Sequence, residues 1–560
     1  MKTASQTARR LLALLSLAAA GALTGEVQAQ GSGGLLASKG GPAPACAAIA
    51  GTIIPAAQIG LPTTGANVTS AALVAANAAG NTNGEYCMIK GAIHPVDKTA
   101  PDIIFQLNIP TNWNKRILQM GGGGYNGTLV TGLGQLSFAP MPTTPLSRGY
   151  ATYGSDSGHR SASGATDATF ALNAEALANF GYASLKKTHD AVGVILRTYF
   201  GPGVAYKSYF GGASSGGRES LTVVSRWPND YDGAYVGAPT ANFWGLRMIG
   251  LPLGKQAYGS AGYLNPAKQA LVFKAAAAAC DAQDGLQDNI ISNVKACQAK
   301  APAIRASLRC PGGADTGDTC LSDAQLKVVD MLHDGLTISY PMAYNVTKYP
   351  GYNVFEGADF NNPGLGLGAS AAVLPEPTTQ ANGYLYAQAT QWLRYIVTQN
   401  PRFDPMSFDP QNPGPYKQRL VELSSIIGAA NPDLSAFKAH GGKVIMLQGL
   451  TDTAVSPNST IALYDSMVQK MGKANVDQVM RFYTVPGFGH GNGVFVPQWD
   501  VLAALDAWVT NGTAPGTLIG TDAAAGAAGR TRPLCVYPAF PKYNGSGDPK
   551  QAASFTCATS

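Results

Sequence analysis

Short apolar segments alternate with glycine-rich turns from about Ile103 onward. Four of them end in a Gly cluster or a turn, as buried strands do: residues 103–109, 116–120, 150–154 and 206–212. Residues 174–200, between the last two, carry the apolar spacing of helices. Strands that alternate with helices predict an α/β fold, in which a mostly parallel sheet is covered by helices on both faces.

The pattern degrades between about Ala241 and Pro432. This interval holds four cysteines, many Pro, Gly, Asn and Tyr residues, and a few helices such as residues 266–279. Two strand-like segments and a closing apolar helix then follow, at residues 443–447, 479–485 and 501–509. We therefore expect two α/β parts around a large inserted domain: residues 30–240, 241–432 and 433–560.

Composition supports a folded chain with a large buried core. Of its 560 residues, 45% are hydrophobic and 13% are charged, which is too little charge for a disordered or coiled-coil protein. The formal net charge of +6 is small for this length, and no run of Lys or Arg exceeds two residues. We therefore expect no nucleic-acid partner.

The N-terminus has the features of a secretory signal peptide. A basic start that includes Arg9 and Arg10 precedes an apolar run at residues 11–23, and small residues suited to cleavage lie before Gln30. The run is shorter than the ~20 residues of a membrane span, and no later segment is long and apolar enough for one. We predict a signal peptide over residues 1–29 and a secreted or periplasmic protein, with a twin-arginine signal as an alternative.

Eight cysteines are scattered along the chain: Cys46, Cys87, Cys280, Cys297, Cys310, Cys320, Cys535 and Cys557. In an exported protein an even number of cysteines predicts disulfides, here four. A zinc site is the alternative, but the chain has no C-x-x-C pair. Eight cysteines permit many pairings, so the connectivity stays open at this point.

The strongest local signal is a G-x-S-x-G motif at residues 212–216, with Ser214 at its centre. An apolar segment precedes it and a helical stretch, residues 217–227, follows it. A tight strand-to-helix turn needs small residues beside the nucleophile and presents the Ser hydroxyl above the sheet edge. Ser214 is therefore the candidate nucleophile, although such motifs also arise by chance in a chain with 67 Gly.

A serine nucleophile needs a base to accept its proton. On this type of sheet the base follows the nucleophile and the acid in the chain, which leaves His333, His440 and His490. His490 lies in a Gly-rich loop directly after the predicted strand 479–485, where the base belongs. His333 suits a helix of the insertion and His440 a surface position, so both are interpreted as structural.

The acid that orients the base should leave the preceding strand. Asp452 follows the predicted strand 443–447 at its carboxyl end, the edge at which a parallel sheet meets its ligands. Of the candidate bases only His490 comes after it. The candidate triad is therefore Ser214, Asp452 and His490, and an Asp that merely caps its loop is the alternative.

Acyl transfer also needs two N–H groups aimed at the oxyanion. One is expected from Ser215, and the other from the Gly-rich loop 120–127 after an early strand. This loop matches G-x-G-x-x-G, which is typical of dinucleotide binding. However, no acidic residue occurs between Gly127 and Asp156 to bind a ribose, so that interpretation is weak.

Three carboxylates surround one glycine within the insertion, at Asp281, Asp284 and Asp288. Calcium binds about six to eight oxygen ligands, so these side chains and nearby carbonyl groups form a candidate site that flanking cysteines would fasten. The spacing and the terminal Glu of an EF-hand are absent. A solvated acidic turn is the alternative.

Together these motifs resemble the tannase and feruloyl esterase family, which includes hydrolases of mono(2-hydroxyethyl) terephthalate. The resemblance covers most of the mature chain and rests on six segments: residues 121–127, 212–219, 280–290, 391–395, 486–490 and 530–535. It implies an α/β-hydrolase fold, a lid inserted after the nucleophile helix, and a structural calcium ion in that lid.

By position, the resemblance also implies a role for individual residues. Ser214, Asp452 and His490 would form the triad, and the N–H groups of Gly124 and Ser215 the oxyanion hole. The implied calcium ligands are three side chains and two carbonyl groups: Asp281, Asp284, Asp288, Leu286 and Ile290. The implied disulfides are Cys46–Cys87, Cys280–Cys297, Cys310–Cys320 and Cys535–Cys557.

One pair of positions departs from the family pattern. Most members have Cys immediately before the nucleophile and immediately after the catalytic His, joined in a disulfide, whereas this chain has Ala213 and Gly491. Both partners are absent together, which favours coherent replacement over an inactive enzyme. Because a disulfide contributes typically ~2–4 kcal/mol, we predict an intact triad with a more mobile His490 loop.

The sequence thus predicts a secreted serine ester hydrolase that cleaves small aromatic acyl esters of feruloyl, galloyl or terephthalate-monoester type. Aliphatic hydroxyalkanoate oligomers are an alternative substrate, and a catalytically silent binding protein is an alternative function. Five aromatic residues are candidate pocket walls, although each of them is more typical of the core: Trp244, Tyr384, Tyr386, Trp392 and Phe495. No substrate-binding residue is assigned.

Overall fold

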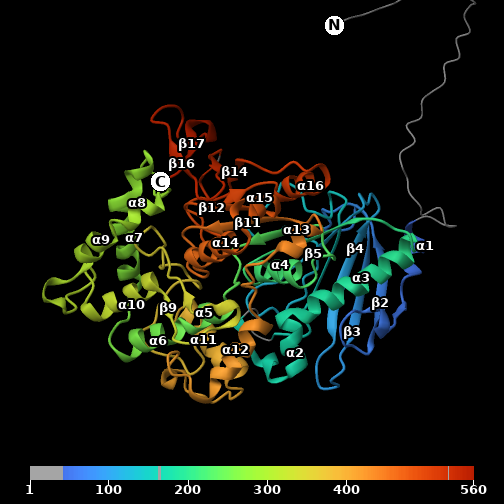
Figure 1. The fold of residues 1–560 in the computed structure, drawn as a ribbon, viewed down its shortest axis with the longest axis horizontal. Coiled ribbons are helices and arrows are strands. Elements are labelled where there is room, and N and C mark those ends of the chain that lie inside the picture. Colours follow the sequence, from blue (N-terminus) through green and yellow to red (C-terminus); the bar gives the residue numbers. More distant parts are fainter. Residues whose placement is uncertain (1–41, 162–165, 528) are drawn as a thin grey trace, which may run out of the picture.

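The computed structural model describes residues 42–161, 166–527 and 529–560, and the predicted signal peptide, residues 1–29, lies outside them. The largest sheet has ten strands (Figure 1), in spatial order β1 (Ile53–Ile54), β2 (Gly65–Val74), β3 (Tyr86–His94), β4 (Ile103–Pro110), β6 (Ala151–Ser155), β5 (Arg116–Met120), β7 (Lys207–Ala213), β8 (Gly233–Gly237), β11 (Lys443–Gly449) and β12 (Met480–Val485). The helices of the α/β parts are α1 (Pro42–Ala47), α2 (Ala174–Ala178), α3 (Ser184–Phe200), α4 (Ser215–Arg226), α13 (Ser435–Ala439), α14 (Pro457–Met471), α15 (Lys473–Val479) and α16 (Val501–Asn511).

The sheet has a parallel half and an antiparallel half. Neighbours from β6 through β5, β7, β8 and β11 to β12 run parallel. Strands β1 to β4 form an antiparallel meander that joins β6. The four strands predicted before the insertion correspond to β4, β5, β6 and β7, and each boundary agrees to within one residue. The predicted α/β fold class is confirmed.

The sheet begins earlier in the chain than the apolar pattern indicates. Strands β2 and β3 precede Ile103, where no strand is predicted. Ala, Ser, Thr and Gly occupy most positions of β2, and several are exposed, so the apolar alternation is weak. Strand β8 was also missed, because it has only five residues and all are buried between β7 and β11. A strand this short carries little periodicity.

Alternate residues of β11 enter different cores, because successive side chains of a strand point to opposite faces. Val444 and Met446 join a cluster with residues of α4 and α14. Ile445 and Leu447 join a second cluster with residues of α16. Helices therefore cover both faces of the sheet, and α3 and α4 lie over it in Figure 1.

Residues 241–432 form a mainly helical insertion, the predicted lid. Most members of the largest core cluster come from it, and Tyr125 and Val455 of the α/β parts join the same cluster. The two regions therefore share a core. The lid elements are α5 (Phe243–Met248), α6 (Gly250–Gly259), α7 (Pro266–Cys280), α8 (Val294–Gln298), α9 (Ala301–Leu308), α10 (Asp323–Asp334), α11 (Tyr384–Gln391), α12 (Lys417–Ile426), β9 (Leu336–Thr337) and β10 (Lys348–Tyr349).

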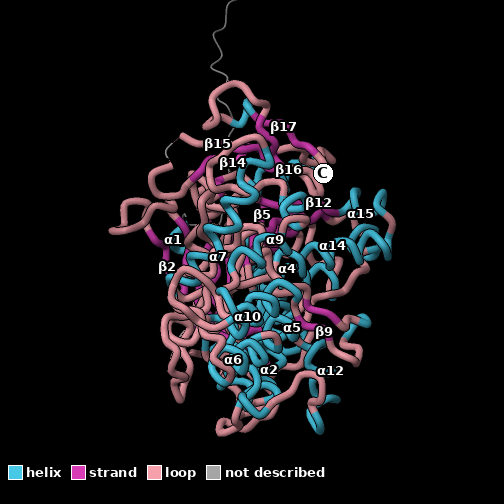
Figure 2. Tube along the Cα trace, turned by 90° about the vertical axis from the view of Figure 1, so that its left-hand side faces the viewer, coloured by secondary structure: helices cyan, strands magenta, loops and turns pink. Residues whose placement is uncertain are grey.

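The C-terminal residues form two small sheets at the end of the molecule opposite the lid helices α6 and α12 (Figures 1 and 2). All eight cysteines are paired, as Cys46–Cys87, Cys280–Cys297, Cys310–Cys320 and Cys535–Cys557. The implied pairing is thus confirmed. The C-terminal strands are β13 (Pro497–Gln498), β14 (Leu518–Asp522), β15 (Thr531–Leu534), β16 (Phe540–Tyr543) and β17 (Phe555–Ala558).

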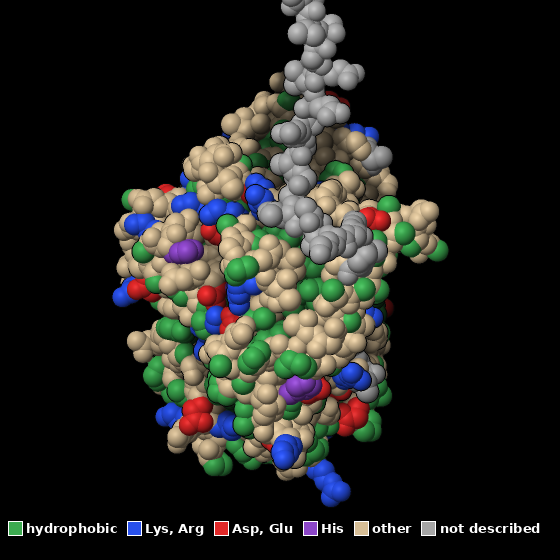
Figure 3. All heavy atoms as spheres, turned by 90° about the vertical axis from the view of Figure 1, so that its right-hand side faces the viewer, with side chains coloured by type: hydrophobic (Ala, Val, Ile, Leu, Met, Phe, Trp, Pro, Cys, Tyr) green, Lys and Arg blue, Asp and Glu red, His purple; other side chains and the backbone are tan. Residues whose placement is uncertain are grey.

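Among the described residues, none of the helices has the length and apolar character that a membrane crossing requires. Figure 3 shows one face of the molecule, on which basic and acidic side chains are interspersed. That face therefore has no continuous basic stripe of the kind that follows a phosphate backbone.

Candidate active site

Ser214 lies in the sharp turn between β7 and α4. Its backbone has φ 59° and ψ −121°, a strained conformation of the kind that clusters at functional sites. Small neighbours permit this turn, since a Cβ added to Gly212 would lie 2.8 Å from Cα of Gly216. A Cβ added to Gly216 would lie 2.9 Å from the carbonyl oxygen of Gly122. The turn has the form of a nucleophile elbow, with the Ser hydroxyl at the carboxyl end of the sheet.

The imidazole of His490 lies between Ser214 and Asp452. Its Nε2 is 3.0 Å from Oγ of Ser214, and its Nδ1 is 2.7 Å from Oδ2 of Asp452. Both are hydrogen-bond distances. The chain therefore brings the turns that follow β7, β11 and β12 to one point, although Ser214 and His490 are 276 residues apart.

Asp452 is wholly buried after β11. Its Oδ1 accepts hydrogen bonds from the N–H groups of Ala454 and Val455, both at 2.8 Å, which leaves Oδ2 directed at His490. The lid supports the same turn, since Asn353 donates its Nδ2 to a carbonyl oxygen there at 2.9 Å. Sequence analysis missed Asn353, because it belongs to no motif and lies 97 residues from the group that it binds.

The other candidate bases lie elsewhere in the fold. His333 belongs to α10, and its Nε2 is 3.5 Å from the buried carboxylate of Glu356. A hydrogen bond to this carboxylate raises the pKa of His333. His440 is exposed at the end of α13. Both residues therefore have the structural or surface positions expected for them.

The Gly-rich loop after β5 packs on the first turn of α4. Gly216 donates its N–H to the carbonyl oxygen of Gly122 at 2.9 Å, and Ser215 Oγ donates to that of Gly124 at 2.5 Å. The N–H of Gly124 has no hydrogen-bond acceptor among the described residues. Ser215 begins α4, so its N–H has no partner within the helix. Among the described residues neither N–H group therefore has a hydrogen-bond acceptor, and Gly124 and Ser214 line the same cleft.

Ser214 and His490 line an open cleft of about 680 Å³. This volume is ample for a drug-sized ligand. Apart from His490, no ionisable group other than the hydroxyl of Tyr384 lines it among the described residues. The polar side chains of the lining are Thr131, Gln135, Ser137, Thr166, Thr379, Gln380, Tyr384 and Gln388, and the apolar ones are Met120, Val130, Phe138, Ala213, Pro363 and Leu365.

Of the five aromatic residues considered as pocket walls, Tyr384 lines this cleft. The other four belong to the buried core instead: Trp244, Tyr386, Trp392 and Phe495. Phe138, which no sequence motif marks, supplies the aromatic ring beside His490, with ring centroids 4.8 Å apart and planes at 80°. The core interpretation was therefore correct for four of the five candidates.

Comparison with known proteins identifies the family. The family model described as tannase and feruloyl esterase matches residues 87–558. The chain belongs to the tannase and feruloyl esterase family. Its members are esterases of small molecules, and this chain is therefore a carboxylic ester hydrolase.

Relatives in the tannase and feruloyl esterase family span nearly the whole chain. An uncharacterised esterase of Agrobacterium fabrum is 43% identical over 521 residues, which cover 92% of this chain and 93% of the relative. A mono(2-hydroxyethyl) terephthalate hydrolase of Piscinibacter sakaiensis is 32% identical, with 85% of each chain covered. The crystal structure of feruloyl esterase B from Aspergillus oryzae has a TM-score of 0.71 at 25% identity and covers 89% of this chain and 98% of that chain. The fold is thus that of an α/β-hydrolase.

In this member of the tannase and feruloyl esterase family, Phe138 packs where the cysteine pair is missing. A Cβ added to Gly491, which has φ 85°, would lie 2.8 Å from Cε1 of Phe138. Phe138 also packs edge-on against Phe488, with centroids 5.7 Å apart. Its own φ of 64° is uncommon for a bulky residue. The ring therefore contacts the His490 loop on both sides of the histidine, and greater mobility of that loop stays a prediction.

Replacing Phe138 by Ala is expected to lower kcat roughly 3- to 10-fold, the equivalent of the ~0.5–1.5 kcal/mol of an aromatic pair. The reason is that the His490 ring loses its edge-to-face contact and spends less time aligned with Ser214. The measurement is kcat on a small acetate ester, which does not fill the cleft. Phe138→Leu, which keeps most of the bulk, is the control, and an unchanged kcat in Phe138→Ala would contradict the role.

The acidic loop of the lid is compact and partly buried. Asp281 and Asp284 are buried, and Asp288 forms an ion pair with Arg532, with 2.6 Å between Oδ2 and Nη2. Burial raises the pKa of Asp284 to about 6. Oδ1 of Asp281 is buried and has no hydrogen-bond partner among the described residues. The other carboxylate oxygens of this loop already accept backbone N–H groups or the guanidinium of Arg532, so the unpartnered Oδ1 of Asp281 is the observation that fits a hard cation such as calcium.

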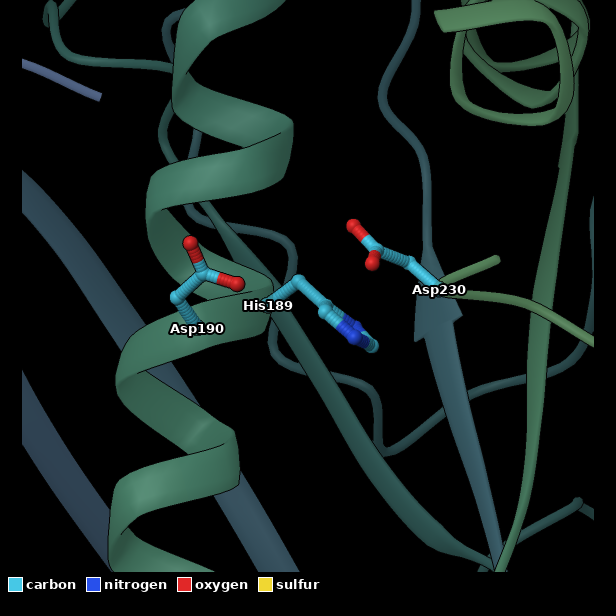
Figure 4. Close-up of side chains that lie close together, drawn as sticks. All are labelled: His189, Asp190 and Asp230. Carbon is cyan, nitrogen blue, oxygen red and sulfur yellow. The ribbon is translucent and has the colours of Figure 1, made fainter. Parts of the chain in front are cut away.

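Among the described residues, the one group of three potential metal-ligand side chains whose ligand atoms lie within 4.8 Å of one another joins α3 to the segment before β8, at His189, Asp190 and Asp230 (Figure 4). The ammonium of Lys186 already lies between the two carboxylates, 2.7 Å from Asp190 and 2.9 Å from Asp230. His189 Nδ1 lies 2.8 Å from the hydroxyl of Tyr153. The ammonium of Lys186 thus offsets part of the charge of the two carboxylates, and we interpret the group as a structural ion-pair network.

Proposed function

We propose that this esterase is an exported serine hydrolase that cleaves aromatic acyl esters through an acyl-enzyme. The observation that carries the proposal is the line of hydroxyl, imidazole and carboxylate in the cleft, with heavy-atom distances of 3.0 and 2.7 Å. A base and an orienting acid in this arrangement activate a serine hydroxyl.

The steps follow from the positions of these groups. His490 Nε2 accepts the proton of Ser214 while Oγ attacks the ester carbonyl, and Asp452 stabilises the resulting imidazolium. The N–H groups of Gly124 and Ser215 donate to the oxyanion of the tetrahedral intermediate. His490 then protonates the leaving alcohol. Water, activated by the same imidazole, hydrolyses the acyl-enzyme and frees Ser214.

The lining of the cleft supports an uncharged acyl group that carries hydroxyl substituents. Apart from His490, the polar side chains of the described lining are uncharged hydrogen-bonding groups. Arg247 is wholly buried behind Tyr384, with its guanidinium 5.9 Å from that ring. The second carboxylate of a terephthalate monoester would therefore meet no Lys or Arg side chain among the described residues of the lining, which is costly where that carboxylate is buried. Feruloyl and galloyl esters fit this lining better.

A substrate panel on the purified protein tests the proposal. We expect kcat/KM on methyl ferulate or methyl gallate to exceed that on mono(2-hydroxyethyl) terephthalate by at least about 10-fold, as expected when polar groups are left unpaired. Highest turnover on a hydroxybutyrate dimer ester would favour the aliphatic alternative. A fluorophosphonate probe should label Ser214, and its failure to do so would favour a silent binding protein.

We also propose that calcium is a structural ligand of the lid loop. Asp281, Asp284 and Asp288, with the carbonyl groups of Leu286 and Ile290, would hold the ion, and its charge would offset the crowding of three carboxylates. The unpartnered Oδ1 of Asp281 supports this assignment.

Removal of calcium is expected to lower Tm by several degrees, because a ligand at 100 times its Kd stabilises the folded state by ~2.7 kcal/mol. Turnover should fall as well, because Ile290 packs against the turn before His490: a Cβ added to Gly487 would lie 3.1 Å from Ile290 Cγ1. Differential scanning fluorimetry with a calcium chelator measures the shift. Calcium should reverse it and magnesium should not.

The matched control for chelation is Asp281→Asn, which weakens the site without removing the loop. Its Tm should already be low and should not respond to the chelator. A wild-type Tm that is the same with chelator and with added calcium would contradict the calcium proposal.

Export is the third part of the proposal. Four disulfides persist in oxidising compartments, and the predicted signal peptide at residues 1–29 would direct the chain there. Immunoblots of periplasmic and culture fractions, with and without residues 1–29, separate a secreted from a periplasmic protein. Retention of the full-length chain in the cytoplasm would contradict export.

A further inference from the structure

Glu219 is a buried carboxylate beside the reaction centre that the proposed steps do not use. It lies one turn along α4 from Ser215 and is 1% exposed. Its Oε2 accepts the N–H of Gly122 at 3.0 Å, and its Oε1 accepts Nδ2 of Asn126 at 2.6 Å. Both partners belong to the Gly-rich loop that carries Gly124. A single side chain thus bonds this loop on either side of the proposed oxyanion donor.

The loop has a backbone that needs such an anchor. Gly124 has φ 57° and Asn126 has φ 59°, so both lie in the left-handed region, which is uncommon for a non-glycine residue such as Asn126. The loop also packs tightly on the helix, because a Cβ added to Gly121 would lie 2.7 Å from Oε2 of Glu219 and 2.7 Å from Cα of Gly216. The position of the loop therefore depends on its contacts with residues of α4.

We propose that Glu219 is a positioning residue that holds the N–H of Gly124 in register with that of Ser215 at the oxyanion site. This inference rests on the proposed acyl-enzyme function. A carboxylate suits the role because it only accepts hydrogen bonds, and both of its loop partners are donors. The buried guanidinium of Arg218, with Nη2 3.5 Å from Oε1, provides a countercharge. Glu219 acts through the loop and touches no substrate.

The hydrogen-bond pattern predicts which substitution fails and which one restores function. Glu219→Gln keeps the shape but offers one oxygen and one NH2 group, so the new amide opposes the N–H of Gly122 or, while Asn126 keeps the orientation in which its Nδ2 also donates to Ser157 Oγ at 2.8 Å, the Nδ2 of Asn126. Adding Asn126→Asp converts one of those donors into an acceptor. The amide oxygen at position 219 can then accept from Gly122, while its NH2 donates to the new carboxylate at position 126.

The experiment compares wild type, Glu219→Gln and the double variant with Asn126→Asp on a chosen aromatic ester. We expect Glu219→Gln to lower kcat by about 10- to 100-fold, less than the complete loss of an oxyanion donor, with KM changed less than about 3-fold. The affinity for an aryl boronic acid, which forms a tetrahedral adduct on the serine, should fall by a similar factor. The double variant should recover most of both losses.

Asp506→Asn is the matched control, because Asp506 is also a carboxylate with two donor partners, Arg116 and the hydroxyl of Tyr209, both at 2.6 Å. It belongs to α16, away from the oxyanion loop. This variant should lose thermal stability without a change in kcat or boronate affinity. A general effect of buried carboxylates on folding would instead lower Tm in both proteins and leave kcat per folded molecule unchanged in both.

Two results would overturn the inference: wild-type kcat and boronate affinity in Glu219→Gln, or a double variant no better than the single one. If Glu219→Gln fails to fold, Asn126→Ala removes one of the two loop bonds while Glu219 stays, and unchanged kcat and boronate affinity there would overturn it equally. Failure of the proposed function is separate, since wild type itself would then neither hydrolyse aromatic esters nor accept a fluorophosphonate at Ser214.

Discussion

Replacing Ser214 by Ala is expected to lower kcat by roughly a million-fold, because the attacking oxygen is lost and the acyl-enzyme cannot form. The oxyanion donors and the cleft remain, so a residual rate about 10³–10⁴ above that in water should persist. The bound ester should keep a similar Kd, since Ser214 contributes one small hydroxyl to the lining. The measurements are kcat on the preferred ester and Kd for that ester by calorimetry with the inactive variant.

The control for this change is Ser225→Ala, on the same helix, where the hydroxyl donates to the backbone carbonyl groups of Leu221 and Thr222. It should keep wild-type kcat. Fluorophosphonate labelling should disappear in Ser214→Ala and persist in Ser225→Ala. Turnover within about 100-fold of wild type in Ser214→Ala would mean that another nucleophile performs the reaction.

Replacing Asp452 by Asn is expected to lower kcat by about 10⁴-fold, although the side chain keeps its shape. The N–H groups of Ala454 and Val455 both donate to Oδ1 at 2.8 Å, so the amide oxygen must take that position. The amide NH2 then faces His490 Nδ1 and donates to it. This forces the imidazole proton onto Nε2, which can no longer accept the proton of Ser214.

A control variant separates the effect of the wrong His490 tautomer from the effect of losing a negative charge. Asp500→Asn is the control, because Asp500 caps α16 by accepting from the N–H of Ala503, and Asn caps a helix equally well. The change also removes a partly exposed ion pair with Arg148, which contributes little to stability. The kcat and Tm of Asp500→Asn should match wild type. A loss below about 10-fold in Asp452→Asn would show that Asp452 does not set the tautomer of His490.

The strands with clear apolar runs were predictable, and those without them were not. Strands β4 to β7 are short, mostly buried and bounded by glycines or turns, and the apolar residues that each contains mark it in the sequence. Strand β2 is partly exposed and lies in the antiparallel part of the sheet. Its small residues are compatible with a strand but form no pattern that identifies one. Its position depends on pairing with β3, which is a contact between strands and not a property of either segment.

The same distinction applies to the residues of the candidate site. Ser214, Asp452 and His490 each follow a recognisable strand in a turn with its own composition, and their order in the chain limits the choice. Phe138 and Asn353 lie in no motif, and they became visible only through contacts with the His490 loop and the Asp452 turn. The aromatic residues considered as pocket walls were expected more often in the core, and the fold buries four of the five there, while Tyr384 lines the cleft.

Local patterning alone therefore determined the α/β architecture, the place of the insertion and the three turns that carry the candidate triad, because strand burial and turn geometry restrict residue types within a few neighbouring positions. The tertiary structure decided how those turns are held and which side chains line the cleft. Glu219 meets Gly122 across 97 residues, and Asn353 reaches its partner across the same separation. The spacing of residues within either segment does not reveal such a contact, because the contact exists only where the sheet and the lid bring the two segments together.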